Sequence, residues 1–177
     1  MKFTKEDARK RVLNCAKQYQ QNLLHKKLLI IFRERQDNSI RFIEIIFHER
    51  NYQHLTGLEL TNTEGKILQH QSKNFYRKCI ENKLGLKDVD KVMGGVNFCL
   101  GLSRENDVFV PSSALLEDIK KLTSSPSQVL AIFEKDIDSE LYSTVKHVAK
   151  GLNLHHLILP PEISSKISLE HYVYRGK

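Results

Sequence analysis

The first clear periodicity in this chain is helical. Between residues 5 and 24 the apolar side chains recur every three or four positions, as on one face of an α-helix; they are Ala8, Val12, Cys15, Ala16, Tyr19 and Leu23. Thr4 precedes this segment and Asp7 follows three positions later, which is the spacing of a capping box. The pattern predicts a helix over residues 5–24.

Two apolar runs come next, over residues 28–33 and 40–48, with the turn-forming residues 37–39 between them. Runs of β-branched and aromatic residues joined by such a turn predict a β-hairpin. Because both runs are apolar at successive positions, we expect each face of the sheet to be covered at least in part. Glu44 interrupts the second run. It is either a partly exposed residue on a face of the sheet or one half of a pair with a basic side chain, and we favour the first interpretation.

The rest of the chain mixes predicted helices and strands. Ser72 can cap a helix that ends at Gly85. A further helix is predicted over residues 113–122, and strands over residues 96–102, 108–110, 129–134 and 154–159. Residues 141–150 suit either a helix or a strand; we favour a strand that forms a hairpin with residues 129–134. The length of 177 residues predicts one α+β domain with a peripheral tail over residues 160–177.

The composition, with 40% hydrophobic and 28% charged residues, is typical of a globular protein. No apolar run approaches the roughly 20 residues that cross a bilayer, and no apolar signal segment opens the chain. We therefore expect a cytoplasmic protein without a membrane partner. Three widely spaced cysteines favour reduced core thiols over disulfides or a metal site. Glycine-rich nucleotide-binding motifs are missing too, so we expect no metal and no other cofactor.

Positive charge is concentrated at the N-terminus. Residues 1–50 contain twelve Lys and Arg against six Asp and Glu, so this segment holds six of the seven net positive charges. Such an asymmetry favours binding of nucleic acid or of an acidic protein, although a solvated helix surface can have the same composition.

Candidate catalytic residues lie close together just after the predicted hairpin, in residues 50–58. Metal-independent RNA cleavage needs a base for the 2′-hydroxyl proton, an acid for the leaving oxygen and donors for the charged phosphorane. We predict His54 as the base or acid, Thr56 as a phosphate donor and Arg50 as an electrostatic clamp; Tyr52 would stack on a nucleobase or carry a proton. An extended backbone would present Tyr52, His54 and Thr56 on one face, whereas a helix would disperse them. A purely structural corner is the alternative to a catalytic segment.

A second group of residues is a candidate for substrate binding. Ser72 and Lys73 lie at a predicted helix N-terminus, where free amides and a cation can hold phosphate. Tyr76 follows on the same helix, and Lys26 and Lys27 precede the first strand. Each also has a simpler explanation: Ser72 as a cap, Tyr76 as a core residue, and the two lysines as an ordinary basic loop.

The Ile- and Phe-rich strand, the Asn-Tyr-x-His-Leu-Thr-Gly motif at residues 51–57 and Phe75-Tyr76 on the following helix resemble a phage-type subfamily of the barnase/EndoU/colicin/RelE-like (BECR-fold) ribonucleases. The resemblance implies N-terminal helices packed on a mainly antiparallel sheet, with residues 1–25 as a basic helix and residues 26–159 as a nuclease-like core. It also implies metal-independent RNA cleavage by a toxin or mobile-element effector, with a possible antitoxin or immunity protein as partner. A non-catalytic RNA-binding or protein-interaction module of the same fold is the alternative.

Overall fold

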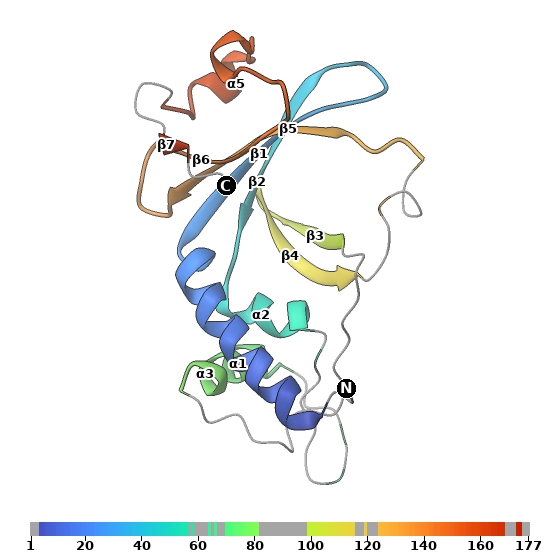
Figure 1. Ribbon diagram of the computed structural model, residues 1–177, viewed down its shortest axis with the longest axis vertical. Coiled ribbons are helices and arrows are strands. Elements are labelled where there is room, and N and C mark those ends of the chain that lie inside the picture. Colours follow the sequence, from blue (N-terminus) through green and yellow to red (C-terminus); the bar gives the residue numbers. More distant parts are fainter. Residues whose placement is uncertain are drawn as a thin grey trace. The chain divides into compact units, whose positions relative to one another are not determined.

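The computed structural model describes residues 4–56, 58, 64, 66, 70–81, 99–115, 119, 124–168 and 173–174. In chain order its elements are α1 (Lys5–Asn22), β1 (Lys26–Arg33), β2 (Ile40–Ile46), α2 (Glu49–Thr56), α3 (Ser72–Ile80), β3 (Cys99–Glu105), β4 (Val108–Leu115), β5 (Gln128–Asp136), β6 (Thr144–Val148), the 3-10 helix η2 (Leu154–His156), α5 (Pro161–Ser164) and β7 (Val173–Tyr174) (Figure 1). Among these described residues, no helix is both long enough and apolar enough to span a membrane.

Contacts divide the chain into two compact units. The first unit comprises residues 1–24, 47–103 and 110–118, and the second comprises residues 25–46, 104–109 and 119–177. Each unit is described by itself below, and the expected organisation as one domain stays a prediction.

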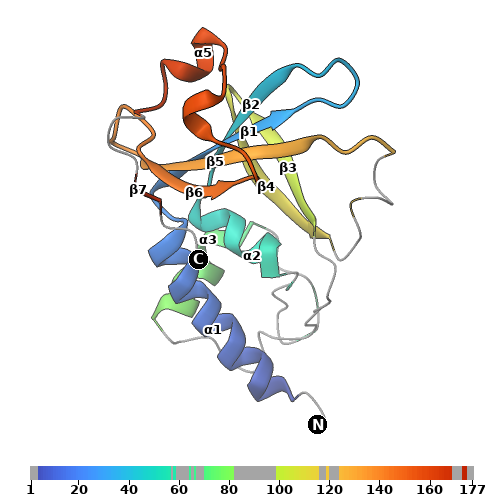
Figure 2. The ribbon, with the colours of Figure 1, turned by 45° about the horizontal axis from the view of Figure 1, so that its top comes forward.

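Three helices, α1, α2 and α3, pack together in the first unit (Figure 2). The predicted capping box of α1 is present. The backbone N–H of Asp7 donates to the Thr4 hydroxyl at 3.2 Å, and the N–H of Thr4 donates to the Asp7 carboxylate at 3.0 Å. The helix predicted over residues 5–24 is thus confirmed, with its end at Asn22.

An aromatic cluster forms the centre of the first unit. Its members come from the three helices and from the residue after β2: Tyr19, Phe47, Tyr52, Phe75 and Tyr76. Ring centroids within the cluster lie 5.2 to 6.1 Å apart, in tilted or edge-on arrangements that are favourable for aromatic pairs. All five side chains are buried. The Phe75 side chain is fully buried and lies on the face of α3 that packs against the other helices.

The strands form a mainly antiparallel sheet, as predicted. Within the described residues its seven strands are ordered β3-β4-β2-β1-β5-β6-β7. β1 pairs antiparallel with β2 and β5, and β5 pairs antiparallel with β6; β2 with β4 and β6 with β7 are parallel pairs. Both predicted hairpins, β1–β2 and β5–β6, are therefore confirmed, together with the α+β fold class.

The main core of the second unit is built on β1, β5 and β6. It is made of Leu29, Ile31, Leu130, Ala131, Phe133, Tyr142, Val145, Leu154, Ile163 and Ile167. Two of these residues, Ile163 and Ile167, come from the segment expected to be a peripheral tail. Their burial and the pairing of β7 with β6 show that the described part of this segment packs on the sheet.

Several local predictions are wrong. β4 continues to Leu115, so residues 113–115 are not helical; of the remaining residues of that predicted helix only Ile119 is described, and it is helical as predicted. Residues 154–156 form a 3-10 helix instead of a strand, because the Asn153 side chain accepts a hydrogen bond from the N–H of His155. Cys15 is exposed and is not a core thiol. Gly85 and the start of the strand predicted over residues 96–102 lie outside the described residues.

Glu44 is buried and paired, which corrects the preferred prediction of a partly exposed residue. Its carboxylate accepts hydrogen bonds from the Tyr142 hydroxyl at 2.7 Å and from the Lys166 ammonium at 3.2 Å, and the Lys27 ammonium lies 3.4 Å away. Desolvation raises the pKa of Glu44, but the Tyr142 hydrogen bond and the two lysines outweigh it, so the pKa is lowered overall. The carboxylate is therefore ionised at neutral pH.

A second buried carboxylate, Glu134, lies on the opposite face of the sheet. β1 pairs Leu28 with Glu134 and Leu29 with Glu44, and successive residues of a strand point to opposite faces. Ammonium groups of Lys26 and Lys146 lie 2.8 Å and 3.2 Å from its two oxygens. Each face thus carries one buried carboxylate with lysine partners.

Candidate active site

A pocket of about 280 Å³ in the first unit is lined by four ionisable residues: His48, Glu49, Arg50 and Lys73. The first three are consecutive at the start of α2, and Lys73 lies in the first turn of α3. α2 packs against α3, and the residues at the start of each helix line the same pocket. His48 and Glu49 are half-buried, whereas Arg50 and Lys73 are exposed, so the pocket is open to solvent.

The backbone of His48 is fixed from three directions. Its N–H donates to the side-chain oxygen of Asn51 at 2.8 Å, which is half of a capping box, and its carbonyl accepts from the N–H of Asn51 at 2.9 Å. The same carbonyl accepts from the Tyr19 hydroxyl at 2.8 Å. Asn51 is itself held, because its amide donates to the carbonyl of Pro111 at 2.8 Å. These bonds fix the position of the His48 backbone beside the pocket that this residue lines.

The four side chains combine the groups that acid–base chemistry on an anion requires. An imidazole and a carboxylate can exchange protons, while a guanidinium and an ammonium can hold negative charge. With a neutral imidazole the pocket carries a net charge of about +1, and the positive end of the α2 dipole adds to it. The pocket is therefore suited to a phosphate or another anion.

The Tyr76 hydroxyl is buried and has no hydrogen-bond partner among the described residues. Burial raises the pKa of Tyr76, and the negative charge of Glu49 raises it further. The phenol consequently stays protonated. Its ring packs on those of Tyr19 and Tyr52, as the core interpretation of this residue requires.

The predicted catalytic segment is helical, so its polar groups are dispersed. Tyr52 is buried and its hydroxyl donates to the Val12 carbonyl at 2.5 Å; burial raises its pKa. His54 is exposed on α2. The Thr56 hydroxyl donates to the Gln53 carbonyl at 2.7 Å, a local bond at the end of the helix. Of these predicted residues, only Arg50 lines the pocket.

The predicted substrate-binding residues are also separated. Lys73 lines the pocket. Ser72 is the first residue of α3 and not its cap, because Gln71 occupies the cap position without a side-chain hydrogen bond. Lys26 and Lys27 belong to the second unit, where they pair with the two buried carboxylates described above. Their predicted roles in binding remain predictions.

His48 and Glu49 were missed by the sequence analysis. Residues 40–48 were assigned to a strand, and a histidine at its end gave no reason to begin the candidate segment before Arg50. A signal was nevertheless present, since His, Glu and Arg occur consecutively at the junction of a strand and a helix.

Residues 11–95 match the model of a protein family described as phage-Barnase-EndoU-ColicinE5/D-RelE like nuclease 4. The matched region contains all four pocket residues. No match was found among curated proteins or among solved structures. The family match confirms the predicted resemblance to BECR-type nucleases and supports a nuclease-type function.

Proposed function

We propose, from the match of residues 11–95 to a nuclease family, that this chain is a metal-independent endoribonuclease whose active site is the pocket of His48, Glu49, Arg50 and Lys73. The observation that carries the proposal is the convergence of a proton-transfer pair and two cations in one open pocket, within the matched region. An imidazole beside a carboxylate supplies both a proton donor and a proton acceptor without a metal ion.

In the proposed reaction, the Glu49 carboxylate removes the proton from a ribose 2′-hydroxyl. The 2′-oxygen then forms a bond to the adjacent phosphorus while the bond from phosphorus to the 5′-oxygen breaks. The protonated His48 imidazole gives its proton to the departing 5′-oxygen. The products are a 2′,3′-cyclic phosphate and a free 5′-hydroxyl, and no external reactant is consumed.

Arg50 and Lys73 stabilise the additional negative charge that develops on the phosphorane. A guanidinium can donate two parallel hydrogen bonds to phosphate oxygens, and an ammonium acts as a point charge. Both cations are exposed, so a substrate can reach them. Removal of one such group typically costs about 10²–10³-fold in turnover.

A pair of histidine variants tests the assignment. Turnover of a short RNA is measured in the presence of EDTA for wild type, His48→Ala and His54→Ala. We expect His48→Ala to lower turnover by about 10²–10⁴-fold, whereas His54→Ala, which removes an exposed histidine of α2 outside the pocket, should stay within a few-fold of wild type. The opposite ranking, with both variants folded, would return the catalytic role to His54.

A pair of lysine variants tests the cation from α3. Lys73 and Lys78 are both exposed on this helix, but only Lys73 lines the pocket. Lys73→Ala should lower turnover by at least tenfold and Lys78→Ala should not. Equal losses in the two variants would indicate a general effect of surface charge and not a contact in the active site.

We further propose that the nuclease acts as a toxin or mobile-element effector and that an inhibitor protein neutralises it. Growth arrest on expression in a bacterial host, relieved by His48→Ala, is the expected result. The basic N-terminal segment, residues 1–50, favours a second candidate function, RNA binding without cleavage. Salt-sensitive retention of RNA by a wild-type protein that never cleaves it would support that candidate instead.

A further inference from the structure

A second pocket lined by ionisable residues lies in the second unit, at the end of the β1–β2 hairpin. Its volume is about 370 Å³, and it is lined by Arg33, Glu34, Arg35, Asn38, Pro126 and Gln128. The register places Arg33 directly opposite Gln128, so the start of β5 forms one wall and the hairpin turn forms the other. All of these residues belong to one compact unit.

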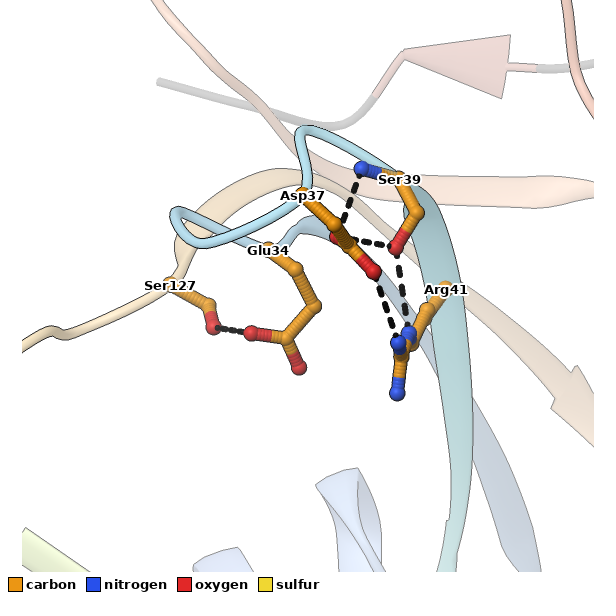
Figure 3. Close-up of polar contacts among 5 residues, drawn as sticks. All are labelled: Glu34, Asp37, Ser39, Arg41 and Ser127. Carbon is orange, nitrogen blue, oxygen red and sulfur yellow. Dashed lines mark hydrogen bonds and ion pairs between the residues drawn. The ribbon is translucent and has the colours of Figure 1, made fainter.

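The acidic groups of this hairpin are engaged by neighbours, as Figure 3 shows. The Asp37 carboxylate accepts hydrogen bonds from the Ser39 hydroxyl at 2.6 Å and from the Arg41 guanidinium at 3.0 Å. These bonds, with that from the Ser39 N–H, lower the pKa of Asp37 to about 2. The Glu34 carboxylate accepts from the Ser127 hydroxyl at 2.8 Å. Neither carboxylate forms an ion pair with Arg33 or Arg35 in the described part of the chain.

The two arginines in the pocket differ from Arg41, which pairs with the Asp37 carboxylate. Among the described residues, the buried Nε of Arg33 has no hydrogen-bond partner, and the exposed Arg35 has no partner either. A buried donor without a partner is uncommon in folded proteins, and no described residue supplies the acceptor that this donor needs. Nε and one terminal nitrogen of a guanidinium point along the same edge, which matches two oxygens of a phosphate.

We propose that this pocket binds a phosphate group. Two guanidinium groups and the Glu34 carboxylate give the pocket a net charge of +1, which balances the single negative charge of a phosphodiester. The side chains of Asn38 and Gln128 supply further amide donors around the same space. Assignment of the ligand to an RNA backbone phosphate rests on the proposed function, whereas the phosphate site itself does not.

Binding to an RNA that cannot be cleaved tests the site independently of catalysis. The affinity of the full chain for a 2′-O-methyl oligoribonucleotide is measured over a range of salt concentrations, for wild type and for a double variant, Arg33→Ala with Arg35→Ala. We expect the double variant to bind more weakly and its logarithmic salt slope to fall by about one. Arg41→Ala is the matched control, because this arginine lies in the same hairpin but is already paired.

A parallel titration uses inorganic phosphate and follows the side-chain Nε–H signals of ¹⁵N-labelled protein by NMR. The Arg33 signal should shift on addition of phosphate, and the Arg41 signal should not. A response to both probes supports a site for RNA phosphate, and a response to inorganic phosphate alone supports a site for a free phosphate compound. The proposal is overturned if neither probe distinguishes the folded double variant from wild type, or if Arg41→Ala causes the same loss.

Discussion

Replacement of Asn51 by alanine probes the link between fold and pocket most closely. The side chain is buried and makes two hydrogen bonds, one with the N–H of His48 and one with the carbonyl of Pro111, both of 2.8 Å. Asn51→Ala leaves both backbone groups without these partners. A buried polar group that loses its partner costs about 1–3 kcal/mol. Since His48 is only half-buried, we expect a total loss of about 2–4 kcal/mol in the free energy of unfolding.

Urea unfolding measures this loss. The chain has no tryptophan and six tyrosines, three in the aromatic cluster of the first unit and three in the second unit, so tyrosine fluorescence reports on the unfolding of both units. Because typical domains are stable by about 5–15 kcal/mol, Asn51→Ala should still be largely folded at low temperature. Its cleavage rate per folded molecule should nevertheless fall by at least tenfold, because the His48 backbone has lost one of its anchors.

Asn51→Asp separates the two hydrogen bonds. Aspartate keeps an acceptor for the N–H of His48 but cannot donate to the carbonyl of Pro111. We expect this variant to be destabilised and yet to cleave, per folded molecule, closer to wild type than Asn51→Ala does. The reasoning is refuted if Asn51→Ala unfolds within about 0.5 kcal/mol of wild type, the range of an ordinary surface substitution, or if its folded molecules cleave at the wild-type rate.

Three further substitutions address the two cores. Tyr52→Phe should cost about 1 kcal/mol for the lost bond to the Val12 carbonyl and leave cleavage unchanged; lost cleavage in a stable variant would restore a catalytic role for this residue. Tyr142→Phe should cost about 1.5–3 kcal/mol in urea unfolding at pH 7, because its partner Glu44 is charged. The pKa of Glu44 is lowered in the folded state. The ionised Glu44 therefore stabilises the folded state above the ordinary pKa of a glutamate, and this stabilisation is lost as the pH falls through the lowered pKa of the folded state. The difference between Tyr142→Phe and wild type should therefore shrink in acid, and a constant difference would contradict this pairing. Phe75→Ala should cost about 3–5 kcal/mol by opening a cavity, and a loss below about 1 kcal/mol would mean that the cluster is not well packed.

Local pattern was sufficient for the elements whose stabilising contacts are local. The capping box at Thr4 and the helical spacing after it predicted α1, and the turn residues 37–39 predicted the β1–β2 hairpin. The segment after β2 was harder, because its eight residues suit more than one conformation. There the helix is fixed by distant partners, as Tyr52 reaches the carbonyl of Val12 and Asn51 reaches that of Pro111.

The candidate site and the buried charges depended on contacts that no local pattern contains. Glu44 was expected to be partly exposed because its partner Tyr142 lies 98 positions away in the chain. Lys73 joins the pocket only through the packing of α3 on α2, and His48 was assigned to a strand that ends two residues earlier. Sequence analysis therefore found Arg50 and Lys73 by residue type, but could not identify the side chains that accompany them.

Analysis of the cleavage products tests the central claim most directly. The substrate is an oligodeoxynucleotide with a single internal ribonucleotide, incubated with the protein in EDTA and examined by mass spectrometry. The proposed chemistry predicts one cut, at the ribonucleotide, that leaves a 2′,3′-cyclic phosphate on one fragment and a 5′-hydroxyl on the other, and His48→Ala should form neither. An oligonucleotide of the same sequence made of DNA alone is the control. Its cleavage, or a product with a 5′-phosphate, would contradict 2′-hydroxyl attack in the pocket of His48 and Glu49.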